Sequence, residues 1–301
     1  MRFSIWLATE QPAEELVETA AHAERTGWDG VYVADHFMPD GERSSTPRLE
    51  AWTTISAVAA VVPRVRIGVL VSGNTYRHPA VLANMSATVD RLSGGRHVLG
   101  LGAGWQVNEH EAYGIDLPPA AERLERLDEA CEVIRLLHTE PRSNFEGRHY
   151  RLVDAPCEPK PVQSPLPLLV GVSGERLGLR VAAKWADEWN CWGLPEEIAA
   201  KSAVLDRHCE AIGRDPASIR RSAQALVLMS EDAGQLAEWR ATDAPVARMI
   251  GTPSELAEVI AAYAAAGVDE FVVSDRTLGA AGTERRAAMD RFIADVAARG
   301  R

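Results

Sequence analysis

Lysine is scarce in this chain of 301 residues, where it occurs only at positions 160, 184 and 201. The formal net charge is −11, so the chain has no excess of basic side chains that could neutralise a phosphate backbone. A nucleic acid is therefore not an expected partner.

Cysteine is also sparse, and its spacing argues against two further classes of protein. The four cysteines form no C-x-x-C pair and have no zinc-like spacing with any of the eight histidines. They are Cys131, Cys157, Cys191 and Cys209. Free thiols in a reducing cytoplasm are expected, with neither a disulfide framework nor a metal site.

Long apolar runs are missing as well. The apolar run in MRFSIWLATEQPAEEL is far too short for the core of a signal peptide, and acidic residues follow it directly. No later segment approaches the roughly 18 apolar residues of a membrane span. The sequence therefore predicts a soluble protein without a membrane partner.

What is present is an alternation of short runs rich in Val, Ile and Leu with longer Ala-rich stretches of helical period, which is typical of repeated βα units. Strands are predicted at residues 3–7, 30–34, 65–71, 97–101, 168–172, 188–191, 221–229 and 270–274. Helices are predicted at residues 12–26, 49–62, 79–92, 120–138, 175–186, 195–212, 253–266 and 283–298. Eight such units predict an α/β fold of the (β/α)₈ TIM-barrel type, whose active site lies at the C-terminal ends of the strands. A doubly wound open sheet is the alternative.

Two stretches interrupt this alternation. Residues 141–167 hold six prolines and the hairpin-like segment NFEGRHYRL, and residues 231–249 also break the pattern. Both are interpreted as insertions, so that residues 1–301 are expected to form a single barrel domain.

Asp35 and His36 directly follow the second predicted strand, in VYVADHFMPD. A barrel places catalytic groups at such strand ends, and an imidazole can exchange a proton with a hydroxyl or carbonyl group near neutral pH. The alternative is that Asp35 caps a turn and His36 packs against a loop.

Three spaced glycines, Gly100, Gly102 and Gly104, lie at and just past the end of the fourth predicted strand, in LSGGRHVLGLGAGW. Glycine at a strand end lets another group approach the backbone closely. A dinucleotide fingerprint would need glycine where Trp105 stands and a βαβ unit around it, so a Rossmann site is excluded. A tight turn without a ligand explains the glycines equally well.

A second glycine-bearing turn, in GVSGERLGLRVAAKWAD, runs from the fifth predicted strand into a helix expected to begin near Glu175. Ser173 and Gly174 stand in this turn, where free N–H groups at a helix start can bind an anion. No Walker lysine follows, so the turn is not a nucleotide-triphosphate loop. An ordinary βα turn is the alternative.

Aromatic and acidic side chains also gather near strand ends. Trp105, Trp189 and Trp192 fall at predicted C-terminal ends, where aromatic walls suit a planar ring system. Core packing accounts for Trp6, Trp28 and Trp52. The carboxyl groups of Glu50, Glu109 and Glu111 are interpreted as loop or capping groups rather than as acid/base catalysts.

Taken together, these stretches resemble the bacterial luciferase-like monooxygenase superfamily over nearly the whole chain. The resemblance is carried in order by VADHF, EAWTTISAVAAVVPRVRIG, TYRHPAVLANMSATVDRLSGGRHVLGLGAGW, NEHEAYG, GERLGLRVAAKWADEWN and GTPSELAEVIAAYAAAGVDEFVV. It implies a (β/α)₈ barrel, in preference to the open sheet, that holds a flavin or deazaflavin at its C-terminal mouth. The SGGR and GLGAGW segments look most like members that use coenzyme F420, whereas other members use FMN.

The resemblance also implies roles for single residues. His36 matches the histidine that serves as acid or base in the sugar-phosphate dehydrogenase branch, and Asp35 matches a position near the deazaflavin ring. Val69 and Leu70 match the site where the family bends its third strand, often with a cis non-prolyl peptide. Further cofactor contacts are expected at Ala103, Gly104, Trp105 and Asn108, and phosphate contacts at Ser173, Gly174 and Glu175.

One departure bears on the substrate. Trp105 stands where the sugar-phosphate dehydrogenases carry a glutamate, and the scarcity of lysine argues against their phosphate pocket. Glucose 6-phosphate is therefore not the expected substrate.

The resemblance predicts an F420-dependent dehydrogenase or reductase that transfers a hydride between the deazaflavin and a small organic substrate. Two alternatives remain: an FMN-dependent monooxygenase on the same scaffold, and a cofactor-binding barrel without turnover. Barrels of this kind often form dimers, so the expected oligomeric state is either a monomer or a homodimer.

Overall fold

The computed structural model describes residues 1–41, 44–244 and 246–299. Residues 42 and 43, in the loop after the second strand, and residue 245, in the second predicted insertion, lie outside the described residues. The barrel strands are β1 (Arg2–Leu7), β2 (Gly30–Val33), β3 (Arg66–Gly73), β4 (His97–Gly102), β7 (Leu168–Gly171), β8 (Glu188–Trp192), β9 (Arg220–Met229) and β11 (Glu270–Ser274).

These strands pair in parallel into a closed barrel. The order β11-β1-β2-β3-β4-β7-β8 is closed by β9, which pairs with both β8 and β11. The (β/α)₈ barrel predicted from the alternation is thus confirmed, and the open sheet is excluded. Each predicted strand is present, with ends shifted by no more than two residues.

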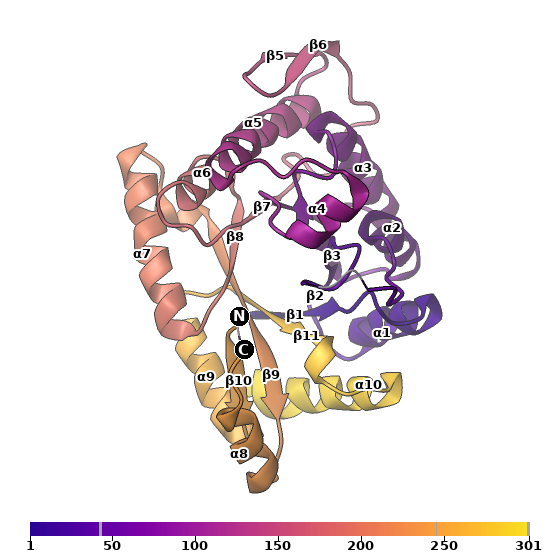
Figure 1. Ribbon diagram of the computed structural model, residues 1–301, viewed down its shortest axis with the longest axis vertical. Coiled ribbons are helices and arrows are strands. Elements are labelled where there is room, and N and C mark those ends of the chain that lie inside the picture. The colour runs from indigo at the N-terminus through magenta and orange to yellow at the C-terminus, as the bar shows by residue number, and fades with distance from the viewer. Residues whose placement is uncertain (42–43, 245, 300–301) are drawn as a thin grey trace.

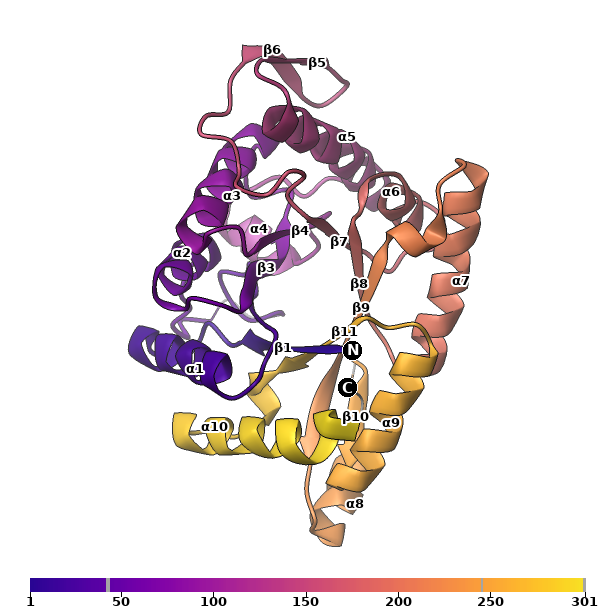
Figure 2. The same ribbon diagram turned by 180° about the vertical axis from the view of Figure 1, so that it is seen from behind.

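Helices surround the barrel in a ring, seen from its two sides in Figure 1 and Figure 2. They are α1 (Ala13–Arg25), α2 (Ala51–Val61), α3 (Pro79–Ser93), α5 (Ala120–Thr139), α6 (Gly178–Trp185), α7 (Pro195–Ala211), α9 (Pro253–Ala265) and α10 (Gly282–Arg291). The sequence did not predict the short helices α4 (Val107–Tyr113) and α8 (Ala233–Ala241), or the strand β10 (Arg248–Gly251).

Local sequence signals explain where several helices begin and end. Helix α3 has Pro79 at its first position, where the missing N–H leaves no bond unmade, and it ends at Gly94 with a left-handed φ of 66°. Helix α9 begins with a capping box in which Thr252 and Glu255 each accept a hydrogen bond from the other's backbone N–H.

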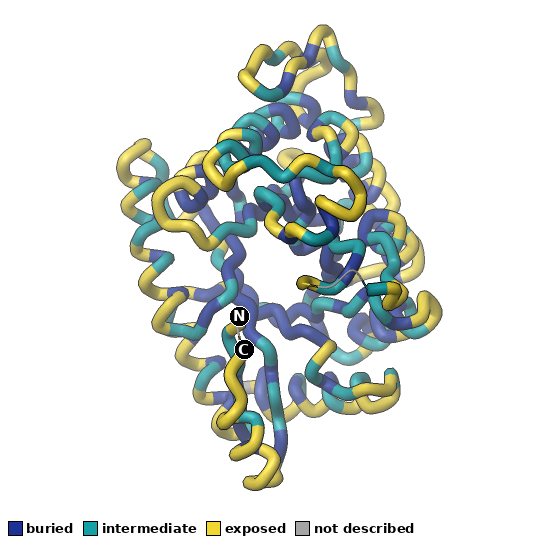
Figure 3. The backbone as a smooth tube through the Cα atoms, viewed as in Figure 1, coloured by how far each residue is buried: buried dark blue, intermediate teal, exposed yellow. Residues whose placement is uncertain are grey.

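The period of two along the strands divides the core into an outer and an inner part. On β1, Phe3, Ile5 and Leu7 are fully buried in the large cluster between barrel and helices. A smaller inner cluster consists of Tyr32, Leu70, Val98, Leu169 and Val272, with Trp6 and Val71 packed against it. Figure 3 shows the barrel strands as mostly buried and the surrounding helices as partly exposed.

A layer of charged groups fills the N-terminal end of the barrel interior. Arg66 donates to Glu188 at 2.5 Å and to Glu270 at 2.6 Å, and both carboxylates are nearly fully buried. Ser4 and Tyr32 also donate to Glu270. Because this layer closes one end, inward-facing groups remain available for ligands at the opposite, C-terminal end.

The two interruptions form small structures outside the barrel. The first holds the hairpin of β5 (Ser143–Glu146) and β6 (Arg151–Ala155), as NFEGRHYRL predicted. The second holds α8 and leads into β10, which pairs with the last four residues of β9. Within the described ranges, the structure has no helix of sufficient length and apolarity to traverse a bilayer.

Candidate active site

The C-terminal ends of the parallel barrel strands bring together side chains that are distant in sequence. Asp35 and His36 follow β2, Trp105 follows β4, and Ser173 follows β7. Helix α4, which continues from the β4 loop, lies across this end of the barrel in Figure 1. We call this end the mouth.

The most developed hydrogen-bond network at the mouth centres on Glu109 of α4, which is fully buried. One carboxylate oxygen accepts from Nδ1 of His36 at 2.8 Å and from the hydroxyl group of Tyr76. The other accepts from the backbone N–H of Phe37 at 2.7 Å. An ionised carboxylate only accepts hydrogen bonds, so Nδ1 of His36 is the donor, and in the neutral imidazole Nε2 carries the lone pair.

These contacts keep the carboxyl group of Glu109 ionised. Burial by itself would raise its pKa, but the hydrogen bonds from His36, Tyr76 and Phe37 outweigh burial and hold the pKa below its ordinary value. Burial and the neighbouring carboxylate raise the pKa of the Tyr76 hydroxyl, which therefore stays protonated and remains a donor. The result is a charged carboxylate that orients one imidazole.

The interpretation of Glu109 as a loop or capping group was therefore incomplete. The residue does stand in the first turn of α4, but its side chain is directed to His36, 73 positions earlier in the chain. The segment NEHEAYG carried the only signal, since it is part of the family resemblance, and nothing local paired it with His36. Glu50, by contrast, does cap α2, accepting from the N–H groups of Trp52 and Thr53, as predicted.

The carboxylate of Asp35 is hydrogen-bonded to other residues of the protein. Its side chain is almost fully buried and receives two bonds from Arg77, at 2.6 and 3.1 Å, and a longer one from the N–H of Gly73. Burial raises its pKa, and the guanidinium of Arg77 opposes that shift. Asp35 thus ties β2 to the loop after β3, and its contact with a cofactor ring stays a prediction.

The third strand bends one residue later than the resemblance implied. The cis peptide joins Leu70 to Val71, and the pairing of β3 with β4 is irregular between Val69 and Ser72. The side chain of Val69 is buried in the outer core, whereas Leu70 belongs to the inner cluster and Val71 packs beside it. Of the two predicted contact residues, only Leu70 therefore has its side chain inside the barrel.

This bend accounts for the spaced glycines. A Cβ on Gly102 or on Gly171 would lie 2.7 Å from a methyl group of Val71, and a Cβ on Gly100 would clash with the carbonyl oxygen of Val69. The group that approaches these glycines is therefore the bent third strand, not a ligand as the functional interpretation held. Gly104 differs, because its φ of 77° itself favours glycine and its Cβ would meet Thr75.

The remaining predicted contacts of the β4 loop are near the network. Ala103 and Asn108 are half-buried, and the amide of Asn108 donates to the carbonyl oxygen of Pro39 at 2.8 Å. Trp105 is 56% exposed, and its ring meets that of His36 edge-on at 5.5 Å. An apolar ring surface thus stands exposed directly beside the imidazole.

Two other tryptophans exchange the positions expected for them. Trp189 was expected at the wall of the site, but it is fully buried in the outer core and donates to the carbonyl oxygen of Val172. Trp6 was assigned to the core, but it packs against the inner cluster and meets Trp192 edge-on at 6.0 Å. Trp6 and Trp192 therefore add aromatic surface inside the barrel to that of Tyr32.

The predicted phosphate turn is exposed, and the helix after it begins later than expected. Ser173, Gly174 and Glu175 are all exposed, and α6 begins at Gly178 after an intervening turn, not near Glu175. Lys201 donates to the carbonyl oxygen of Ser173 at 3.0 Å. A Cβ on Gly174 would meet no atom of the described residues within 4 Å, so free space adjoins this turn.

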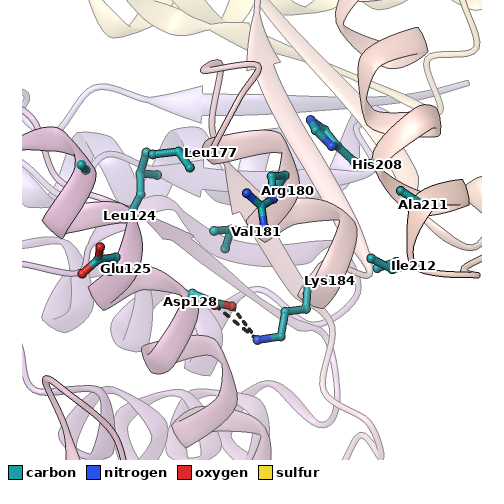
Figure 4. A pocket seen from close by; sticks show the side chains of 11 residues that line it. Leu124, Glu125, Asp128, Leu177, Arg180, Val181, Lys184, His208, Ala211 and Ile212 are labelled. Atoms are coloured by element: carbon teal, nitrogen blue, oxygen red, sulfur yellow. Dashed lines mark hydrogen bonds and ion pairs between the residues drawn. The ribbon is translucent and has the colours of Figure 1, made fainter.

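A separate groove of about 600 Å³ lies outside the barrel, between α5, α6 and α7 (Figure 4). The ammonium group of Lys184 and the carboxylate of Asp128 form an ion pair of 3.1 Å within it, while Arg180 points into the groove. None of the predicted cofactor residues lines it. The groove is therefore not the candidate active site.

Comparison with known proteins agrees with this geometry. The family model described as luciferase-like monooxygenase matches residues 1–247. An F420-dependent glucose-6-phosphate dehydrogenase of Amycolatopsis mediterranei is 41% identical over 174 residues, which are 57% of this chain and 50% of that protein. A protein of the same name from Intrasporangium calvum is 31% identical over an alignment of 320 residues, which covers 94% of this chain and 93% of that protein.

The chain thus spans about half the length of the first relative and nearly all of the second. The solved structure of a coenzyme F420-dependent tetrahydromethanopterin reductase from Methanopyrus kandleri shares the fold, with a TM-score of 0.84 at 18% identity, over 100% of this chain and 99% of that one. With a family model that matches most of its length, the chain belongs to the luciferase-like monooxygenase family.

Proposed function

We propose that this protein is an F420-dependent oxidoreductase in which His36 exchanges a proton with an alcohol or carbonyl substrate. The main support is the hydrogen bond that Nδ1–H of His36 donates to the buried carboxylate of Glu109. This bond leaves Nε2 as the basic nitrogen. The relative from Intrasporangium calvum, which this chain matches over 93% of its length, is named F420-dependent glucose-6-phosphate dehydrogenase, which supports the choice of cofactor.

The residues at the mouth suit a planar, anionic cofactor. Leu70 and Val71 present apolar surface inside the barrel, and free space adjoins the turn at Ser173 and Gly174, where the cofactor phosphate would bind. When bound, F420 supplies a two-electron hydride acceptor or donor. The protein supplies the position of the substrate and the place for its proton.

The role of His36 follows from the direction of its hydrogen bonds. With Nδ1–H held by Glu109, Nε2 accepts the hydroxyl proton of an alcohol, and the carboxylate stabilises the imidazolium that forms. In the opposite direction the same nitrogen returns the proton to a carbonyl oxygen. Nε2 has no hydrogen-bond partner among the described residues, and the side chain is 22% exposed, so a substrate can reach it.

The test is a side-by-side titration of the purified protein with F420 and with FMN, followed by the fluorescence of each cofactor. Markedly tighter binding of F420 is expected. Equal binding, or a preference for FMN, would contradict the deazaflavin assignment and favour the monooxygenase alternative.

A second measurement separates an enzyme from a cofactor-binding barrel without turnover. The F420-loaded protein is mixed with alcohols and carbonyl compounds, and His36→Asn is compared with the unchanged protein. Turnover is expected to fall by about 10²- to 10⁴-fold, with F420 affinity retained. Turnover that persists within a factor of a few would remove His36 from the mechanism.

A further inference from the structure

Three neighbouring loops at the mouth gather a compact charged cluster that the proton-transfer network does not use. Glu10 follows β1, Arg48 lies in the long loop after β2, and Arg276 follows β11; we call these three residues the Arg48 cluster. Strands β11, β1 and β2 are adjacent in the barrel, so their C-terminal ends meet. The N–H of Leu49 also bonds the carbonyl oxygen of Thr9 at 2.9 Å, which joins two of these loops.

The cluster carries more positive than negative charge. Both guanidinium groups, of Arg48 and Arg276, bind the same carboxylate oxygen of Glu10. The nearby carboxylate of Asp275 already faces Arg285 and accepts bonds from the N–H of Ala8 and from Gln11. The three residues alone carry about one unit of positive charge, which the ionised Glu109 near Arg48 partly offsets, and the Arg48 side chain is only 4% exposed.

Four polar atoms around this cluster are buried and have no hydrogen-bond partner among the residues that the structure describes. They are Nε1 of Trp6, Oγ1 of Thr9, Oε2 of Glu10 and Nε of Arg48. Buried polar groups are ordinarily paired, and a ligand at the cluster would supply partners for these four atoms. Trp6 and Arg48 offer N–H donors, and the hydroxyl of Thr9 can also donate, whereas the oxygen of Glu10 can take a water or a substrate hydroxyl.

The cluster adjoins both the aromatic surface and the histidine. The guanidinium carbon of Arg276 lies 5.8 Å from the ring centre of Trp6, which in turn meets Trp192. Arg48 is close enough to interact electrostatically with Glu109, the partner of His36. A ligand group held at the Arg48 cluster therefore shares one end of the barrel with the proton-transferring residue.

We propose, on the basis of the function proposed above, that the Arg48 cluster binds the carboxylate of the substrate. The substrate class is then a small carboxylic acid that also bears the reacting alcohol or carbonyl group. A planar carboxylate with two oxygens matches the N–H donors of arginine and indole.

The test measures binding of lactate and of its neutral amide, lactamide, to the F420-loaded protein by calorimetry at constant ionic strength. Lactate is expected to bind at least about tenfold more tightly than lactamide. Arg48→Gln should remove that difference and leave F420 affinity unchanged. Arg142→Gln, an exposed arginine on the distant hairpin, is the matched control and should bind lactate normally.

Each other outcome has a defined meaning. Lactate that binds no better than lactamide, or equally well to the Arg48→Gln variant, overturns the proposal, as does tighter binding of glucose 6-phosphate than of lactate. If Arg48→Gln fails to fold, the exposed Arg276→Gln replaces it and is held to the same criterion. Failure to bind F420 at all contradicts the proposed function instead, and that step is measured first.

Discussion

Replacing Glu109 by glutamine removes a charge with almost no change in shape, and the structure predicts how the network will respond. The carboxylate has acceptor oxygens on both sides, one for His36 and Tyr76 and one for the N–H of Phe37. Glutamine has one oxygen and one NH₂ group, so the two sides can no longer both accept.

Each orientation of the new amide has a calculable consequence. If its oxygen faces His36, the NH₂ group opposes the N–H of Phe37 in a site with no access to water, which costs about 1–3 kcal/mol. If its oxygen faces Phe37, the NH₂ group donates to Nδ1 of His36, and the imidazole proton moves to Nε2. The second orientation leaves only the rotatable hydroxyl proton of Tyr76 without its acceptor, whereas the first leaves the fixed N–H of Phe37 unpaired, so we expect the second to dominate.

The expected result of Glu109→Gln is therefore loss of the basic nitrogen with little loss of stability. Turnover should fall by about 10²- to 10⁴-fold while F420 affinity is retained. Nitrogen-15 NMR of the histidine rings tests the tautomer directly and needs no substrate: Nδ1 of His36 should carry the proton in the unchanged protein and Nε2 in the variant.

The matched control is Glu129→Gln, because Glu129 also accepts several bonds, from the N–H groups of Arg148, His149 and Tyr150, but bonds neither His36 nor Tyr76. It should leave the His36 spectrum and the turnover unchanged. The reasoning would be refuted if Glu109→Gln kept the original tautomer of His36 and its turnover.

Three further predictions concern the cofactor turn, the bent strand and a buried histidine. Gly174→Val should fold normally, because its Cβ meets no protein atom, but should weaken F420 binding in a fluorescence titration; unchanged binding would place the phosphate elsewhere. Gly100→Ala should lower the free energy of unfolding in urea by about 1–3 kcal/mol through its clash with β3, whereas Gly174→Ala should not, and equal effects would contradict the role of the bend. Burial lowers the pKa of His97 from 6.5 to about 4, so its contribution to stability is present above pH 6.5 and is lost as the pH falls toward 4. Between pH 6.5 and pH 4, the free energy of unfolding of the unchanged protein should fall by about 3 kcal/mol more than that of His97→Gln. Parallel pH profiles of the two proteins would refute this prediction.

The sequence alone determined the eight βα units, because the strands and most of the helices have strong local signals, and the family resemblance favoured the barrel over the open sheet. A strand buried on both faces, such as residues 30–34, is a continuous apolar run, and a long helix such as α5 repeats its apolar residues over many turns. The seven residues of α4 are too few for such a pattern. The turn before α6 contains no residue that marks where the helix begins. Those elements were therefore missed or displaced.

The position of His36 at a strand end could likewise be predicted, since chain order fixes which residues follow a strand. Its partner could not, because Glu109 meets it only after the barrel has closed and α4 has folded over the mouth. The glycines of β4 were visible in the sequence, but only the tertiary structure shows that the bent strand at Val71 occupies the space they leave. Local propensity acts within a few residues, whereas these contacts depend on packing between segments more than 25 residues apart, and for that reason the structure alone decided them.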